Sequence, residues 1–374
     1  MARGMLQLIA PFLENARFSR EHFMQTHSKI DFRPVVESRV IDPDLPSLAR
    51  SLRESRGIAH KADIADVTRA LAALAPVGVA ATSAIPVGDD CAAIPDGDGY
   101  LLFAIEGFLN EFVDREPWFA GYCGVMVNVS DIYAMGGRPL AIVDAVWSRG
   151  GDAIKPVIDG LIAGSAAYGV PIVGGHSNRR SDREQLSVAI LGRARQLLTS
   201  FDARSGEHLV AAFDLRGRFQ DPYAYWNAST GAPAERLRGD LEILPELAEA
   251  GLCRAAKDIS MAGVVGTALM LLECSGVGAE IAIDAIPRPP GVDLLRWLTA
   301  FPSFGFLLSV SDTSLPEVLA RFEARGLAAA SIGRVDDTRT LYIERQGERE
   351  SIWNFEEQAL IGCAPQVTPQ LTPH

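Results

Sequence analysis

The stretch Asn128–Val146, NVSDIYAMGGRPLAIVDAV, says most about how this chain folds. Its first part continues an apolar helix that begins near Phe119, and the glycine pair 136–137 ends that helix, because successive glycines favour a helix end. Its second part has the apolar, β-branched content of a buried strand. Asn128 and Asp131 lie one helical turn apart, so their side chains share one face of the helix.

Strand patterns recur on both sides of this stretch, and helical patterns separate them. They lie at residues 100–108, 139–147, 170–176 and 186–194, and again at 208–215, 278–284, 304–310, 328–335 and 340–346. Because strands and helices alternate without a short repeat, we expect two α+β halves of about 150 residues each. We place domains at 44–198 and 199–350, an N-terminal appendage without clean periodicity at 1–43, and a C-terminal tail at 351–374.

The composition excludes several classes of protein. The chain has 374 residues, 48% of them hydrophobic, so it can bury a full core. No apolar run reaches the roughly 18 residues that span a bilayer, which argues against a membrane protein. The net charge of −12 argues against a binder of nucleic-acid backbones. The five cysteines lack a metal-binding spacing and no signal-peptide cleavage site is visible, so we expect a cytoplasmic protein with reduced thiols.

Acidic side chains gather at predicted element ends in the first half. Asp89 and Asp90 follow Gly88 just before a strand, Glu106 ends the next strand, and Asp131 lies on the helix described above. If the fold gathers them, each like-charged pair about 4 Å apart costs roughly 4 kcal/mol, and a divalent cation removes that cost. All-oxygen ligands favour Mg²⁺ or Ca²⁺, and protein-bound Mg²⁺ commonly also binds phosphate, which points to a nucleotide. Taken singly, the same residues also fit turns, helix caps or a solvated helix face.

Several motifs together resemble one known superfamily. They are GDDCAAI at 88–94, NVSDIYAMGGRPLAIVDAV at 128–146, VPIVGGHS at 170–177 and AAKDISMAGVVGTALMLLECSGVGAEI at 255–281. They are similar to those of aminoimidazole ribonucleotide (AIR) synthase, thiamine-monophosphate kinase, the hydrogenase maturation protein HypE and selenophosphate synthetase. The overall pattern most resembles the uncharacterised AIR synthase-related branch.

This resemblance implies a fold, an assembly and a cofactor. The fold is the two-domain α+β (α/β) AIR synthase (PurM)-like fold, with a C-terminal α/β sandwich domain. The implied assembly is a homodimer in which N-terminal strands of both subunits build a barrel. The implied cofactors are ATP and Mg²⁺, bound in a cleft between the halves, with a small-molecule substrate.

The resemblance also implies roles for individual residues. By motif, the metal ligands are Asp89, Asp90, Asp131 and Glu106, and Asn128 supports them. In the second half, Asp258 is a catalytic carboxylate near the phosphates, and Ser260 is a phosphate contact.

Groups that would contact phosphate are few. The chain has no Gly-Lys pair and no Gly-x-Gly-x-x-Gly run after a strand, which excludes P-loop and Rossmann sites. Lys61 and Arg149 are the candidate cations, although both also fit solvated positions. Gly174 and Gly175 would let backbone amides approach a phosphate. His176 either contacts the nucleotide, as a hydrogen-bonding or acid/base group, or is a turn histidine satisfied by backbone.

Departures from the family pattern leave the reaction open. This chain has Gly-Gly-His where thiamine-monophosphate kinase has Gly-Gly-Asp, and its DISMA motif at 258–262 has one carboxylate fewer. We expect phosphoryl transfer to a small acceptor. AIR synthase-like activation of an amide or carbonyl, and a nucleotide-binding scaffold without catalysis, are the alternatives. The segment FQDPYAYWNAST at 219–230 either lines the acceptor site or is an inserted loop.

Overall fold

The computed structural model describes residues 42–73 and 84–363. The expected appendage, residues 1–43, therefore lies outside the described residues except for its last two. Of these, Asp42 accepts hydrogen bonds from Arg288 (3.3 Å) and Arg345 (2.9 Å), which ties the start of the described chain to its second half. Within the described ranges, no helix has both the length and the apolar character needed to cross a membrane.

The first half is built on a five-stranded sheet in the order β1-β2-β5-β3-β4, in which β3 and β4 are parallel and the other neighbours antiparallel. Its strands are β1 (Ala92–Asp96), β2 (Gly99–Gly107), β3 (Arg138–Trp147), β4 (Ile172–Asn178) and β5 (Gln185–Ala194). Its helices are α4 (Asn110–Arg115), α5 (Pro117–Ala134) and α6 (Ile154–Tyr168). The strands predicted at 100–108, 139–147 and 186–194 are confirmed to within one residue.

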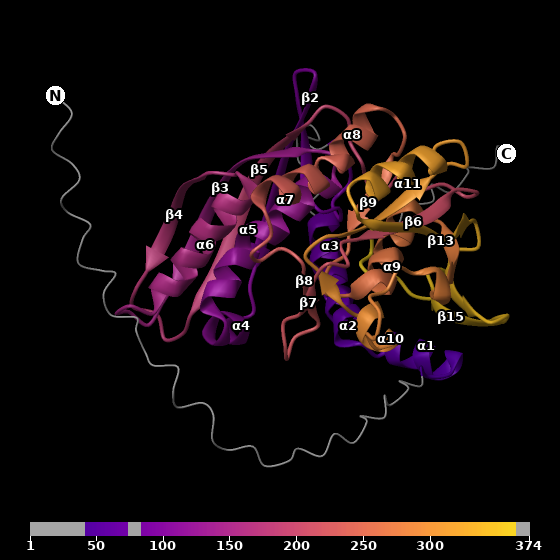
Figure 1. Ribbon diagram of the computed structural model, residues 1–374, viewed down its shortest axis with the longest axis horizontal. Helices are drawn as coiled ribbons and strands as arrows, with labels where there is room; N and C mark the ends of the chain where they lie inside the picture. Colours follow the sequence, from indigo (N-terminus) through magenta and orange to yellow (C-terminus); the bar gives the residue numbers. More distant parts are fainter. Residues whose placement is uncertain (1–41, 74–83, 364–374) are drawn as a thin grey trace, which may run out of the picture. The chain divides into compact units, whose positions relative to one another are not determined.

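Helix α5 is buried on nearly every side because it packs between the sheet and α6 (Figure 1). Pro117 fits its first turn, where a missing N–H leaves no bond unmade. Gly136, just beyond its end, has φ +74°, a left-handed conformation that favours glycine. A Cβ at Gly160 of α6 would overlap the carbonyl oxygen of Trp118, so the two helices approach this closely only with glycine there. The polar residues of α5 are therefore held on a tightly packed element.

The second half contains a seven-stranded sheet in the order β15-β14-β10-β13-β6-β12-β9, in which β10 and β14 are parallel and the other neighbours antiparallel. Its strands are β6 (His208–Phe213), β9 (Ala255–Asp258), β10 (Gly278–Ala282), β12 (Gly305–Val310), β13 (Ala328–Asp336), β14 (Thr340–Arg345) and β15 (Glu348–Asn354). Its helices are α7 (Ala234–Leu241), α8 (Ile243–Glu249), α9 (Gly263–Ser275), α10 (Leu294–Leu298) and α11 (Leu315–Ala324), with a 3-10 turn, η1 (Ile283–Ala285). The two sheets with their helices confirm the expected α+β fold.

The first helices pack on the second half, although they precede the first sheet in sequence. They are α1 (Leu45–Arg53), α2 (Arg56–Ala62) and α3 (Ile64–Ala73). Helix α1 contacts β15 and α10, and α2 contacts α9 (Figure 1). The reason is the apolar stripe of α1, in which Leu45, Leu48 and Leu52 are buried. The sequence-based domain 44–198 therefore includes helices that complete the other half.

The expected C-terminal tail, residues 351–374, begins inside the second half: its described residues, 351–363, continue the fold. Strand β15 continues to Asn354. The backbone N–H groups of residues 360–362 then donate hydrogen bonds of 2.7 to 3.2 Å to the carboxylate of Glu273 on α9. Glu273 is buried, and three donors compensate the burial of its charge. The described part of this segment is thereby fixed to the second half.

A small three-stranded sheet in the order β11-β8-β7 comes from β7 (Arg218–Phe219), β8 (Tyr225–Asn227) and β11 (Phe301–Pro302). The indole Nε1 of Trp226 donates to the carbonyl oxygen of Asp214 (2.9 Å). The Oγ of Ser229, just after β8, lies 2.5 Å from the hydroxyl of Tyr122 and 2.6 Å from that of Tyr168. The segment 219–230, which contains β7 and β8, is therefore bonded to both halves.

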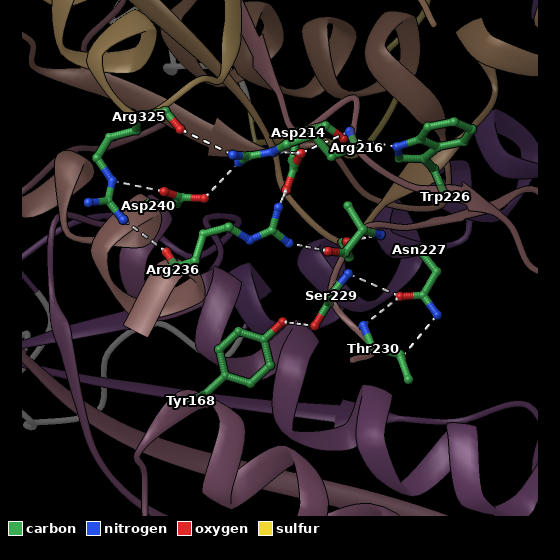
Figure 2. Close-up of polar contacts among 12 residues, drawn as sticks. Tyr168, Asp214, Arg216, Trp226, Asn227, Ser229, Thr230, Arg236, Asp240 and Arg325 are labelled. Carbon is green, nitrogen blue, oxygen red and sulfur yellow. Dashed lines mark hydrogen bonds and ion pairs between the residues drawn. The ribbon is translucent and has the colours of Figure 1, made fainter. Parts of the chain in front are cut away.

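Figure 2 shows an ionic network of two aspartates and three arginines of the second half. The buried carboxylate of Asp214 pairs with Arg216 (2.7 Å) and Arg236 (3.1 Å). The equally buried Asp240 pairs with Arg216 (3.0 Å) and Arg325 (2.9 Å). Arg236 also donates to the carbonyl oxygen of Ala228 (2.7 Å), so the network is bonded directly to the end of β8.

Candidate functional site

A cavity of about 430 Å³ is lined by residues from both halves of the chain. It collects most of the residues that the sequence singled out, namely Lys61, Asp89, Asp90, Glu106, Asp131, Asp258 and Ser260. The other candidates, Asn128, Arg149, Gly174, Gly175 and His176, do not line it. The fold therefore brings the acidic motifs together and leaves the Gly-Gly-His motif elsewhere.

Three carboxylates form the centre of this cavity. Asp90, Asp131 and Asp258 each offer one oxygen, and these oxygens all lie within 4.8 Å of one another. We call these three residues the acidic centre. Asp90 precedes β1, Asp131 lies on α5, and Asp258 ends β9, so the acidic centre exists only when the two halves are packed together.

Burial and mutual repulsion keep protons on the acidic centre. Burial, and then the charge of Asp90, raise the pKa of Asp258 to about 8, although Lys257 acts in the opposite direction. Burial, and then the charges of Asp258 and Glu106, raise the pKa of Asp131 well above its ordinary value. Without a cation, the centre is thus an unfavourable concentration of negative charge.

Lys257 offsets part of this charge from inside the protein. Its side chain is only 4% exposed, and its ammonium group is ion-paired with Asp90. Burial lowers the pKa of Lys257, but the carboxylates of Asp90, Asp89 and Asp258 outweigh it, so the pKa is raised. Lys257 therefore balances the charge of Asp90, whereas ionisation of Asp131 and Asp258 calls for a further cation.

Asp89, the first aspartate of the pair, has a different partner. Its carboxylate accepts hydrogen bonds from the backbone N–H (2.7 Å) and the hydroxyl (2.6 Å) of Ser200, in the segment that joins the two sheets. Burial, and then Asp90, raise its pKa to about 6. Asp89 therefore bonds to the segment between the two sheets, whereas Asp90 belongs to the acidic centre.

The residues of the acidic centre fit a divalent cation. Asp131 Oδ2 is buried and accepts no hydrogen bond from the described part of the chain, and Ser260 Oγ is likewise buried without a partner there. Buried polar atoms are nearly always bonded, so unpaired ones in a cavity indicate a missing ligand. The donor set contains only oxygen, which suits Mg²⁺ or Ca²⁺ rather than zinc.

Two charged side chains lie around this centre. Glu106 ends β2 and its carboxylate opens onto the cavity, yet the surrounding protein removes enough water to raise its pKa. The ammonium group of Lys61, on α2, opposes that rise. It also opposes the rise in the pKa of Asp258, although less strongly than Lys257 does. Lys61 is thus the lining cation that is not ion-paired within the described residues.

Asn128 and Arg149 occupy other environments. Asn128 is fully buried on α5, where its Nδ2 donates to the carbonyl oxygen of Gly124 (2.8 Å) and its Oδ1 lacks a partner among the described residues. The guanidinium of Arg149 donates to the carbonyl oxygen of Asp182 (3.0 Å) and pairs with Asp114 (3.2 Å). Arg149, just after the end of β3, is therefore already bonded to other protein groups.

The Gly-Gly-His motif is part of a strand and not a turn. Gly174, Gly175 and His176 lie inside β4, which continues to Asn178 and pairs with β3 on one side. β4 is an edge of the sheet, and all three residues are exposed. The predicted turn is wrong because parallel pairing with β3 keeps the glycines extended. The ring of His176 lies 6.4 Å from that of Trp147.

Aromatic side chains also line the cavity, and most of them were not predicted from the sequence. We define the aromatic wall as the lining residues Phe108, Phe112, Phe119, Tyr225 and Phe301. Tyr225 belongs to the segment 219–230, so that segment does line the cavity. The others come from 108–119 and from β11. The aromatic content of GFLNEFVDREPWF at 107–119 was a signal, but aromatic residues near a strand end more often indicate core packing.

The raised pKa values predict how stability depends on pH. A carboxyl whose pKa is higher in the folded state favours folding below its ordinary pKa, and that contribution is lost as pH rises through the raised value. With Asp89 at about 6 and Asp258 at about 8, the metal-free protein is expected to lose stability as pH rises from about 4 to about 8. Mg²⁺ is expected to reduce this loss. Thermal unfolding in chelator and in Mg²⁺ across this range measures both effects, and a flat profile without metal would contradict them.

Comparison with known proteins gives two family matches. Residues 88–194 match the N-terminal domain of AIR synthase related proteins, and residues 199–345 match their C-terminal domain. An uncharacterised Synechocystis protein, sll0787, is 47% identical over 85% of this chain and 98% of its own length. The phosphoribosylformylglycinamidine synthase subunit PurL of Methanosarcina mazei is 28% identical over 70% of this chain, which spans only 40% of that subunit.

A solved structure has the same fold. PurL of Thermotoga maritima, in complex with ATP, superposes with a TM-score of 0.62 at 22% identity. The alignment covers 76% of this chain and 48% of PurL, so this chain spans about half of that protein. The likeness extends over both sheets and is a likeness of fold.

Proposed function

This chain belongs to the AIR synthase related protein family, and we propose that it is a Mg-ATP-dependent enzyme that transfers the γ-phosphoryl group of ATP to an oxygen of a small molecule. The acidic centre carries this proposal, because its three carboxylates come from both halves and include an unpaired buried oxygen. The structure of a PurL with ATP, in the same fold, supports the nucleotide.

The residues of the cavity would have separate roles in binding the metal and the phosphates. Asp90, Asp131 and Asp258 would hold Mg²⁺, with Glu106 as a further carboxylate beside them. When bound, Mg²⁺ supplies charge neutralisation for the phosphates. Lys61 and the unpaired Ser260 Oγ donate to phosphate oxygens. Little covalent chemistry is asked of the protein in phosphoryl transfer, so positioning and charge stabilisation account for the rate.

The transfer step balances without a further reactant. An acceptor oxygen attacks the γ-phosphorus, the bond from that phosphorus to the β,γ-bridging oxygen breaks, and ADP leaves. For a hydroxyl acceptor, one proton is released. Asp258 would hold Mg²⁺ and is therefore not free to take that proton, so the proton passes to water.

A second reaction begins with the same step. If the acceptor oxygen belongs to an amide or carbonyl, the phosphorylated oxygen leaves later as inorganic phosphate, as in AIR synthase-like chemistry. The likeness to PurL favours this alternative. Loss of catalysis, with nucleotide binding kept, is the remaining alternative.

Calorimetric titration with ATP tests the proposal. Binding near about 1 μM, roughly −8 kcal/mol, that requires Mg²⁺ is the expected result. Absence of ATP binding with and without Mg²⁺ would overturn it. Binding of ATP without formation of ADP, over a panel of acceptors, would leave the non-catalytic nucleotide-binding scaffold as the remaining alternative. ADP with a phosphorylated product indicates a kinase, and ADP with inorganic phosphate and a condensed product indicates the amide or carbonyl reaction.

We propose in addition that the protein is a homodimer joined through its five-stranded sheet. On the face opposite α5, large apolar side chains are exposed, namely Ile94, Phe103, Ile105, Leu140, Val143 and Val173. Alternate residues of β2 point the other way and are buried. A contiguous apolar sheet face of this kind is typical of an interface. The motif at 174–176 lies on β4 of the same sheet, so a dimer would place it at or near that interface.

Replacing Ile105 by lysine is expected to convert the dimer into a monomer. The side chain of Ile105 is 65% exposed in the single subunit, so the dimer would have to bury the lysine's charge between two subunits. Light scattering after gel filtration gives the mass. Ile162→Lys is the matched control, since Ile162 is also exposed but lies on α6, away from the sheet. A monomeric parent protein, or equal effects of both changes, would argue against this interface.

A further inference from the structure

The aromatic wall and the charges of the cavity together indicate what kind of acceptor the site takes. We propose that the acceptor is a small aromatic or apolar molecule that carries no phosphate, and that its apolar body lies against the aromatic wall. This inference rests on the proposed function, since it concerns the second substrate of the same site.

The aromatic wall is a packed cluster of rings, in which Phe112 and Phe119 are buried and Phe108, Tyr225 and Phe301 are partly exposed. Phe112 is its centre, with edge-to-face contacts to Phe119 (6.0 Å between centroids) and Tyr225 (5.3 Å). Tyr225 in turn contacts Phe301 edge-to-face at 5.9 Å, and Phe108 lies 6.5 Å from Phe112. Such edge-to-face packing holds each ring in one orientation. The wall therefore offers a pre-formed apolar surface.

Polar groups beside the wall are few, and the side chain of Asn227 is already bonded. Asn227 lines the cavity, but its Oδ1 accepts from the N–H groups of Ser229 (3.1 Å) and Thr230 (3.0 Å), and its Nδ2 donates to the hydroxyl of Thr230 (Figure 2). The hydroxyl of Ser303, also a lining residue, accepts from the N–H of Ala228 (2.9 Å). The side chain of Asn227 is thus used within its own turn, and the hydroxyls of Ser303 and Tyr225 are the polar groups left to orient a mostly apolar ligand at this end of the cavity.

The charges of the lining disfavour a phosphorylated acceptor. Its carboxylates are Asp89, Asp90, Glu106, Asp131 and Asp258, whereas its cations are Lys61 and Lys257. Lys257 is paired with Asp90, and Lys61 is the group assigned to the phosphates of ATP. No further cation of the described residues lines the cavity. Because Mg²⁺ and Lys61 are both assigned to the phosphates of ATP, the described lining has no cation left for a second phosphate.

Arg56 does not line the cavity, but its charge acts on Tyr225. It lowers the pKa of Tyr225, but burial outweighs it and raises that pKa to about 12. The Nε of Arg56 donates to His60 at 3.4 Å. An arginine that lines no part of the cavity does not create a phosphate site on the aromatic wall.

Fragment binding tests the inference on the intact protein. Benzyl alcohol and benzyl phosphate share the ring and differ in the phosphate. Saturation-transfer NMR would follow each of them with the protein alone and with saturating Mg²⁺ and the non-hydrolysable analogue AMPPCP. We expect benzyl alcohol to bind in both conditions, at least about tenfold more tightly than benzyl phosphate. Calorimetry with Mg-AMPPCP, made separately, reports on the nucleotide site, so failure of the proposed function and failure of this inference are distinguishable.

A positive charge added to the cavity lining sharpens the test. Leu109 lines the cavity next to Phe108 and is 43% exposed, so Leu109→Arg alters the charge with little risk to folding. This variant is expected to bind benzyl phosphate at least about tenfold more tightly than the parent does. Ile162→Arg, on the surface of α6, is the control and is expected to leave the affinity for both fragments unchanged.

Three outcomes would overturn the inference. One is tighter binding of benzyl phosphate than of benzyl alcohol by the parent protein. Another is binding of neither fragment in either condition. The third is displacement of benzyl alcohol by Mg-AMPPCP, which would assign the aromatic wall to the adenine base. Binding of benzyl alcohol together with the nucleotide, and the gain in Leu109→Arg, support an unphosphorylated apolar acceptor.

Discussion

Asp131→Asn is expected to weaken Mg-ATP binding at least about 100-fold, the largest functional effect of any single change in this chain. Asp131 contributes the unpaired buried Oδ2 of the acidic centre. An amide keeps the shape of the side chain but removes the negative charge that would hold the cation. The backbone is not disturbed, because the N–H of Met135 still donates to the carbonyl oxygen of Asp131.

The same substitution is expected to stabilise the metal-free protein. The pKa of Asp131 is raised first by burial and then by Asp258 and Glu106, so its charge opposes folding above its ordinary pKa. Thermal unfolding in chelator at about pH 8 should therefore give a higher midpoint for Asp131→Asn than for the parent. Weaker binding together with higher stability separates a metal ligand from a structural residue, whose loss lowers both.

Asp159→Asn is the matched control for these two measurements. Asp159 lies on α6, half exposed, and pairs only with Lys155 one turn away (2.5 Å). Its replacement is expected to leave Mg-ATP affinity unchanged. If Asp131→Asn bound Mg-ATP as tightly as Asp159→Asn does, the acidic centre would not be the metal site.

Asp240→Ala is expected to cost about 3–5 kcal/mol of unfolding free energy, a large part of the stability of a typical protein. Its carboxylate is 3% exposed and pairs with Arg216 (3.0 Å) and Arg325 (2.9 Å). Removing it leaves the guanidinium group of Arg325 without a carboxylate among the described residues and leaves Arg216 paired with Asp214 alone. Breaking a buried pair costs more than the pair itself contributes, since the remaining charges stay partly buried.

Urea unfolding measures this loss. Glu317→Ala is the control, because Glu317 pairs with Arg321 on the surface of α11 (2.7 Å) and such exposed pairs contribute at most about 1 kcal/mol. Equal unfolding free energies for the two variants would show that the ionic network is dispensable for stability. Because Arg236 of this network is bonded to the end of β8, Asp240→Ala is also expected to weaken benzyl alcohol binding at the aromatic wall.

Local patterns were sufficient for much of the fold. The helix that ends at Gly136 could be predicted because its apolar residues and its terminal glycines are neighbours in sequence. The strands at 100–108 and 139–147 could be predicted because a run of β-branched and apolar residues of that length has few other structures. The position of β4 at a sheet edge could not, since edge and centre strands differ in their neighbours and not in their own residues.

The site was predictable only in part. The motifs around Asp90 and Asp131 could be recognised, but not which aspartate of the pair at 89–90 faces the centre. Ser200, more than a hundred residues further along the chain, bonds the first of them and leaves the second free to meet Lys257. Phe112 and Tyr225 likewise meet across two distant segments, and neither segment alone indicates a binding surface.

The sequence by itself determined the family, the α+β fold and the presence of an acidic, oxygen-only motif set, because periodicity and motif order are properties of neighbouring residues. Only the tertiary structure decided that Asp90, Asp131 and Asp258 form one centre, that His176 lies outside the cavity, and that an aromatic wall stands beside the centre. The physical reason is that these distances are set by how α5 and β9 pack against each other, which depends on the whole buried core and not on any local pattern.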